Sequence, residues 1–60
     1  MLEQQRHRLI LDLLDEKQFV RLQELTETLN ASAATIRRDI NKLADEGLLT
    51  KIHGGAQLPA

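Results

Sequence analysis

The sequence predicts a mostly α-helical fold that closes with a small β-hairpin, and three observations lead to this prediction. Leucine and isoleucine recur at helical spacing in three separate segments. Near the C-terminus, a glycine pair lies between two short segments of extended character. The chain has only 60 residues and no cysteine, so one small apolar core must hold a single domain without disulfides.

The first helix is predicted from about Leu2 to Asp15. At about 100° per residue, one face of this segment is apolar. Its members are Leu2, Leu9, Ile10, Leu13 and Leu14. Arg6 falls near the middle of this stripe, and His7 falls on the polar side or its margin. The apolar periodicity stops at the sequence EKQ, so we expect the helix to have ended there.

A short extended segment, residues 19–22, separates the first helix from the second. The second helix is predicted over residues 22–30, with three leucines at spacings of three and four facing inward. Asn30 is a suitable last residue, because asparagine tolerates the left-handed backbone conformation. The second helix is therefore only about two turns long.

The third helix is predicted over residues 33–46. Ser32 is expected to cap its N-terminus through a hydroxyl that accepts a backbone N–H. Ile36, Ile40 and Leu43 form its apolar face. Gly47 is expected to end the helix, with Leu48 packing back against it.

The final segment is predicted to be a hairpin whose register has two candidates. A two-residue loop, Gly54-Gly55, would pair Ile52 with Gln57 and mix polar and apolar residues on each face. A three-residue loop, residues 54–56, would pair Ile52 with Leu58. The outward residues would then be Lys51, His53 and Gln57. We prefer this second register, because it separates the apolar from the polar side chains.

The outward face of the third helix indicates contact with a duplex. Its members are Ala34, Arg38, Asn41, Lys42 and Asp45, with Thr35 and Arg37 at the margins. Although the net charge is −1, residues 35–42 carry three positive charges and one negative. In a DNA major groove, small residues permit close approach, arginine reaches guanine or phosphate, and asparagine pairs with adenine. The acidic residues lie at the other end of the helix, away from the phosphates.

Arg6 and Asp39 suggest a different role. A guanidinium on a packing face costs several kcal/mol unless it is paired. We therefore expect Arg6 and Asp39 to form a partly buried ion pair that joins the first and third helices. On this hypothesis Asp39 orients the third helix and does not contact DNA itself.

Other functions are less consistent with the composition. An exposed Arg-Arg pair alone is most often a solvated surface, and a Gly-Gly pair alone is most often a turn. His7 and His53 lack companions at metal-ligand spacing, so neither a metal site nor a cofactor is expected. The chain offers no nucleophile–base pair for an enzyme. It also has no apolar run long enough for a membrane span, and the N-terminus is too polar for a signal peptide.

Two separated motifs in this chain resemble the N-terminal winged helix-turn-helix domain of the DeoR family of bacterial transcriptional regulators. Residues 35–39, Thr-Ile-Arg-Arg-Asp, match the recognition helix of that family, followed here by Ile40 in place of leucine. Residues 53–56, His-Gly-Gly-Ala, match its wing, with Lys51 in place of the usual arginine. Lysine keeps the charge but not the planar fork, which favours phosphate contact over base reading. The resemblance covers nearly the whole chain.

The resemblance implies a three-helix winged helix-turn-helix in which helix 33–46 enters the major groove and residues 49–58 form the wing. Thr35, Arg37 and Arg38 would then contact DNA, together with Ser32 at the helix start and Lys51 and His53 on the wing. The family implies a cytoplasmic, nucleoid-associated repressor of genes for sugar or sugar-derivative catabolism. Residues 1–58 would be the DNA-binding domain, and residues 59–60 would begin a linker to a C-terminal domain. That further domain would bind a sugar-phosphate effector and form a homo-oligomer.

The alternative is a winged-helix module that binds another protein and never contacts nucleic acid. The net charge and the acidic side chains of Glu24 and Glu27 favour this alternative slightly. It predicts a partner affinity that is insensitive to salt, whereas binding to DNA weakens steeply with salt.

Overall fold

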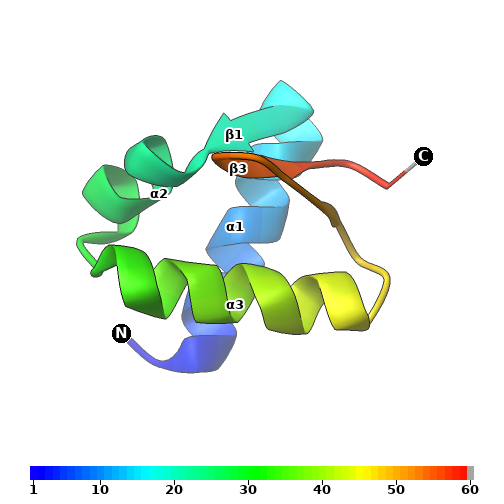
Figure 1. The fold of residues 1–60 in the computed structure, drawn as a ribbon. Coiled ribbons are helices and arrows are strands. Elements are labelled where there is room, and N and C mark those ends of the chain that lie inside the picture. The colour runs from blue at the N-terminus through cyan, green and yellow to red at the C-terminus, as the bar shows by residue number, and fades with distance from the viewer. Residues whose placement is uncertain (60) are drawn as a thin grey trace.

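The computed structural model describes residues 1–59, which form three helices and one three-stranded sheet. The elements are α1 (Glu3–Lys17), β1 (Phe19–Arg21), α2 (Leu22–Leu29), α3 (Ala33–Asp45), β2 (Thr50–Ile52) and β3 (Gly55–Gln57). In Figure 1, α1 crosses α3, and strands β1 and β3 lie at the end of α1 far from the N-terminus. The mostly α-helical winged helix-turn-helix predicted from the sequence is confirmed.

One apolar cluster unites all three helices with the sheet. Its buried members are Ile10, Leu14, Val20, Leu25, Leu29, Ile36, Ile40, Leu43, Leu49 and Ala56. The three inward residues predicted for α3 are all among them. Every helix therefore contributes one face to a shared core, which fixes α3 against α1 and α2 and leaves its opposite face to solvent.

The α1 helix departs from its prediction in two exposed leucines and at its C-terminal end. Leu2 and Leu9 were placed on the apolar stripe, but both are exposed. The helix also continues to Lys17, two residues beyond the predicted end. It stops where Gln18 adopts a left-handed conformation (φ 69°) and donates its N–H to the carbonyl of Leu14 at 2.6 Å. Apolar periodicity reports the core-facing part of a helix, whereas backbone hydrogen bonds continue through solvated residues.

The caps of the helix-turn-helix agree with the sequence. Asn30 ends α2 in the left-handed conformation (φ 52°), with its N–H bonded to the Thr26 carbonyl. Two residues later, Ser32 caps the N-terminus of α3, and its Oγ accepts the Thr35 N–H at 3.2 Å. These two caps keep the turn short, so the orientation of α3 relative to α2 is well defined.

The end of α3 is a Schellman motif in which the predicted packing residue is wrong. Gly47 has φ 77°, and the Leu48 N–H bonds to the Leu43 carbonyl at 3.0 Å. Leu48 does not pack back, since it is 45% exposed. Leu49, at 3%, enters the core instead. The backbone leaves the left-handed glycine in a direction that brings the second leucine, and not the first, over the core.

The hairpin adopts neither predicted register. Ile52 pairs with Gly55, and Lys51 pairs with Ala56, so the loop consists of His53 and Gly54. The two glycines have separate tasks. Gly54 provides the positive φ (77°) of the loop. Gly55 lies in the strand, where a Cβ would stand only 2.2 Å from the carbonyl oxygen of Val20.

That close approach reflects a pairing that the sequence did not reveal. Strand β3 is central in the order β1-β3-β2, and Val20 of β1 pairs with Ala56. The Leu22 N–H, at the start of α2, donates to the Gly54 carbonyl at 2.8 Å. The tip of the wing is therefore attached to the helix-turn-helix, and not only to its own partner strand.

We expect Gly55→Ala to destabilise the domain more than Gly54→Ala. At Gly55 the new methyl group meets backbone, which cannot rotate away, so a loss of about 1–3 kcal/mol is expected. At Gly54 the space is open and only the left-handed conformation is strained, at about 1 kcal/mol. Urea unfolding of both variants measures the difference, and equal losses would contradict the assignment of the two glycines.

Candidate nucleic-acid interface

The exposed face of α3 carries the residues of this helix that are predicted to contact DNA. Ala34, Arg37, Arg38, Asn41 and Lys42 are all exposed, and Thr35 is half-buried. This face is not covered by the hairpin within residues 1–59, because its side chains remain in contact with solvent. A helix presenting two arginines and an asparagine in its first turns can hydrogen-bond to base edges and phosphates.

Ser32 and Thr35 form a closed pair at the start of α3. The Ser32 hydroxyl accepts the Thr35 N–H and donates to Thr35 Oγ1 at 3.0 Å. The donor capacity of Ser32 is therefore used inside the cap, whereas Thr35 keeps its own hydroxyl proton for an external acceptor. Of the two residues, Thr35 is the better placed to donate to DNA.

The hairpin brings the predicted wing residues next to α3. Lys51 and His53 are exposed, and both border a groove of about 420 Å³ that Arg37 borders from the helix. Arg38 does not line this groove. The two adjacent arginines of α3 therefore lie in different surroundings.

The distribution of ion pairs concentrates unpaired cations at this surface. Four basic side chains lie in ion pairs within the described residues: Arg6, Arg8, Lys17 and Lys42. Four are in none of these pairs: Arg21, Arg37, Arg38 and Lys51. Three of the latter four belong to α3 and the wing. The net charge of −1 thus conceals a local excess of free positive charge, which attracts polyanions.

Lys42 differs from the other predicted contact residues. Its Nζ donates to Glu3 Oε2 at 2.7 Å, which ties the middle of α3 to the start of α1. This hydrogen bond lowers the pKa of the Glu3 carboxyl below its ordinary value. The charge of Lys42 is thereby partly neutralised, and a phosphate would have to compete with Glu3 for it.

The expected ion pair between the first and third helices is present. Arg6 Nε donates to Asp39 Oδ2 at 2.6 Å, and Nη2 donates to Oδ1 at 3.1 Å. The Asp39 side chain is 0% exposed and that of Arg6 is 16% exposed. This two-pronged contact holds α3 by a carboxylate on its inner side, opposite the exposed arginines.

His7 is a member of this cluster that sequence reasoning missed. Its Nε2 lies 3.1 Å from Asp39 Oδ1, although the stripe analysis placed it on the polar side or its margin. The available signal was its spacing of three and seven residues from Ile10 and Leu14, both buried, which places it on the core-facing side of α1. The prediction that neither histidine has companions at metal-ligand spacing was wrong for His7, since Glu3, His7 and Asp39 bring potential ligand atoms within 4.8 Å of one another. Arg6 and Lys42 already occupy those carboxylates, so a metal ion would have to displace both.

The protonation of Asp39 is set by two opposing effects. Burial by itself raises the pKa of this carboxyl, but the hydrogen bonds from Arg6 and His7 outweigh burial and lower the pKa below its ordinary value. The folded state therefore binds this proton less readily than the unfolded chain does. The resulting stabilisation is present above the unfolded pKa and is lost as the pH falls through the folded one.

We expect the stability advantage of the wild type over Asp39→Asn to shrink in acid. At about pH 5 the Asp39 carboxylate is ionised in both the folded and the unfolded state. Below about pH 4, the ordinary pKa of aspartate, the unfolded chain takes up the proton first, so the advantage is lost progressively until the folded carboxyl, whose pKa is lower, is protonated too. The pKa of the Glu3 carboxyl is lowered too, but the wild type and Asp39→Asn both retain Glu3, so its contribution to the difference largely cancels. Urea unfolding of both proteins across this range measures the effect. A gap that persists unchanged into strong acid would contradict it.

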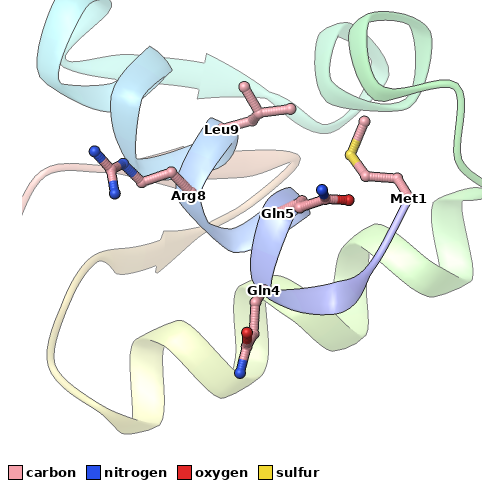
Figure 2. Close-up of a pocket in the computed structure, with 5 residues that line it drawn as sticks. All are labelled: Met1, Gln4, Gln5, Arg8 and Leu9. Carbon is pink, nitrogen blue, oxygen red and sulfur yellow. The ribbon is translucent and has the colours of Figure 1, made fainter.

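Two further features lie outside this surface. An open hollow of about 490 Å³ beside α1 is lined by Met1, Gln4, Gln5, Arg8 and Leu9. In Figure 2 the side chain of Arg8 points away from Met1. None of the lining residues belongs to α3 or the hairpin. Within residues 1–59, no helix combines the length and the apolar character that crossing a membrane requires.

Comparison with known proteins identifies relatives over nearly the whole chain. A family model described as the DeoR-like helix-turn-helix domain matches residues 6–60. An uncharacterized HTH-type transcriptional regulator of Bacillus subtilis, FruR, is 46% identical over 93% of the chain. The glycerol-3-phosphate regulon repressor of Escherichia coli is 43% identical over 100% of it. The transcriptional regulator UlaR of Salmonella arizonae is 47% identical over 95%.

These matches cover only part of each relative. The chain spans 22%, 24% and 23% of the three proteins, which is about a quarter of their length. Comparison with solved structures gave no match. The relatives are named as regulators of transcription and not as enzymes.

Proposed function

This chain belongs to the family of DeoR-like helix-turn-helix domains, and from that premise we propose that residues 1–58 bind operator DNA for a transcriptional repressor. The observation that carries the proposal is the exposed face of α3, where Arg37 and Arg38 lie in no ion pair of the described structure. These side chains do not contribute to the core, and unpaired arginines on a helix can bind the phosphates and base edges of a DNA duplex.

The proposed complex places α3 in the major groove and the hairpin on the adjacent backbone. Ala34 permits the helix to approach the bases closely, while Arg38 and Asn41 reach base edges. Lys51 contacts phosphate, for which a point charge suffices. The Arg6–Asp39 pair lies on the far side of α3 and sets the angle at which the helix is presented.

The wider assignment rests on the named relatives. One represses a glycerol-3-phosphate regulon, so we propose that this domain regulates genes of sugar or sugar-derivative catabolism. Residues 59–60 would begin a linker to a C-terminal domain that binds a sugar phosphate and forms a homo-oligomer. The protein would act in the cytoplasm, at the nucleoid. In a dimer, two copies of α3 would read half-sites about one helical turn, or a multiple of that, apart.

The alternative of a protein-interaction module is not favoured. The relatives are transcriptional regulators, and one of the two acidic side chains that supported the alternative, Glu24, forms an ion pair with Lys17. The positive charges without an ion pair are concentrated at α3 and the hairpin, where a protein partner would not require them.

Selection from a random duplex pool, using the domain fused to a dimerising tag, tests the proposed function. We expect recovery of a related set of sequences with two half-sites, bound with an affinity that falls steeply between about 50 and 200 mM salt. Amide shifts on adding a recovered duplex should concentrate in α3 and the hairpin. Shifts confined to α1, or recovery of unrelated sequences, would refute the proposal.

A further inference from the structure

We propose that the groove between α3 and the hairpin is a subsite for one phosphodiester of the DNA backbone, in which Arg37 and Lys51 hold the phosphate between them. This inference rests on the proposed function and deepens it. It assigns the two adjacent arginines of α3 to different tasks: Arg37 contacts the backbone and Arg38 contacts the bases.

The charges bordering the groove match an anion. Its lining consists of Leu22, Arg37, Ile40, Lys51, Ile52, His53, Gly54 and Gly55, of which none is acidic. Arg37 approaches from the helix and Lys51 from strand β2, so an anion in the groove meets cations from two elements. Neither cation has a competing carboxylate in the described structure, in contrast to Lys42. A phosphate there would neutralise charge that nothing else neutralises.

The remainder of the lining fits a sugar. Leu22, Ile40 and Ile52 are at least half-buried and provide apolar carbon at the base of the groove. Gly54 adds backbone without a side chain, and the place that a Cβ would take there is open. A deoxyribose has an apolar face beside its charged phosphate, so the combination of an apolar base and cationic rims suits a nucleotide backbone unit better than it suits a bare ion.

Helical geometry separates Arg37 from Arg38. Consecutive residues of a helix project about 100° apart, so the two guanidinium groups cannot serve one surface equally. Arg37 lines the groove, whereas Arg38 lines no part of it. Arg37 instead turns toward the hairpin. The pair is thus divided between the wing side and the outward side of α3.

A scan of neutral phosphates tests the assignment. In a duplex recovered by the random-pool selection, each phosphate is replaced in turn by an uncharged methylphosphonate, and the affinity of each duplex is measured. For the wild type, several positions should weaken binding. At one and the same position in each half-site, the weakening should be smaller in Arg37→Ala and in Lys51→Ala than in the wild type, because each variant retains only one of the two cations that serve that phosphate. Each variant should also lower the salt slope by about one, which corresponds to about fourfold in affinity between 50 and 200 mM salt.

Arg21→Ala is the matched control. It removes an arginine that is also exposed and also lies in no ion pair, but Arg21 does not line the groove. Its scan should keep the weakening at the position that Arg37 and Lys51 share, and so should the scan of Arg38→Ala. If Arg37 and Lys51 respond at different phosphates, or at none, while base preference is retained, the subsite is refuted and the proposed function stands. A domain with no preference for any duplex would refute both.

A small anion is the remaining candidate occupant, and it has its own measurement. Inorganic phosphate is titrated while the amide signals of Gly54 and Gly55 are followed. We expect weak shifts that a duplex reproduces at far lower concentration, because the sugar and neighbouring contacts are missing from the free ion. Binding of inorganic phosphate more tightly than the duplex would identify a small-anion site and overturn the assignment to DNA.

Discussion

Arg6→Ala is expected to lower the free energy of unfolding by about 3 kcal/mol, near the lower end of the range for breaking a buried ion pair. The substitution leaves the Asp39 carboxylate, which is 0% exposed, with His7 as its only partner in the described structure. The low end applies because the Arg6 side chain is 16% exposed in the wild type, so water partly screens the pair and less is lost when it is broken. A domain of this size has a total stability of about 3–9 kcal/mol, so this loss removes about a third of it or more.

Urea unfolding monitored by circular dichroism measures this loss, and Arg8→Ala serves as its control. Arg8 lies on the same helix and also pairs with a carboxylate, Asp12, but both side chains are exposed. That variant should stay within about 0.5 kcal/mol of the wild type, because surface ion pairs contribute little. Equal losses in the two variants would show that burial adds nothing to the Arg6 pair.

A double-mutant cycle separates the pair from the packing of each side chain. Arg6→Ala and Asp39→Ala should each destabilise the domain. The combined variant should lose less than the sum, because it leaves no uncompensated buried charge. Additive losses would mean that the two side chains stabilise the domain independently, despite hydrogen bonds of 2.6 and 3.1 Å.

Arg38→Ala is expected to weaken binding to the selected duplex by about 5- to 150-fold, the equivalent of 1–3 kcal/mol, and to relax base preference at one position. The guanidinium lies in no ion pair and is exposed on the outward face of α3. A two-pronged contact to guanine gives both affinity and discrimination, and truncation removes both. Because the side chain is exposed, the fold should be unaffected.

Binding measured on the selected duplex and on single-base variants of it tests this prediction, with Lys51→Ala as the comparison. Lys51→Ala, on the wing, should weaken binding to all these duplexes alike. If Arg38→Ala also weakens all of them alike, its contact is with phosphate, and another residue of α3 must read the bases.

The features that sequence reasoning predicted correctly are those in which a local pattern has a single physical explanation. The apolar face of α3 follows from helical spacing, and Ser32, Asn30 and Gly47 are cap residues by their own chemistry. The Arg6–Asp39 pair was predictable because a charge on a packing face demands a partner. The exposure of the outward face of α3 was predictable to the same extent, since polar residues opposite an apolar stripe have a defined direction.

The features that were missed depend on contacts between segments far apart in the chain. The hairpin register follows from the approach of Gly55 to Val20, and no pattern within residues 49–58 encodes that neighbour. The Lys42–Glu3 contact joins residues 39 positions apart, and His7 reaches Asp39 across 32. Which partners a long side chain can reach is determined only when the helices pack, so periodicity alone cannot identify these contacts.

The bond from the Leu22 N–H to the Gly54 carbonyl also determines when the wing becomes ordered. A hairpin tethered at its tip loses its conformational freedom when the domain folds and not when it meets a ligand. Recognition by helix and ribbon is then a single rigid-body encounter, and the entropic penalty of arranging a mobile loop does not subtract from affinity.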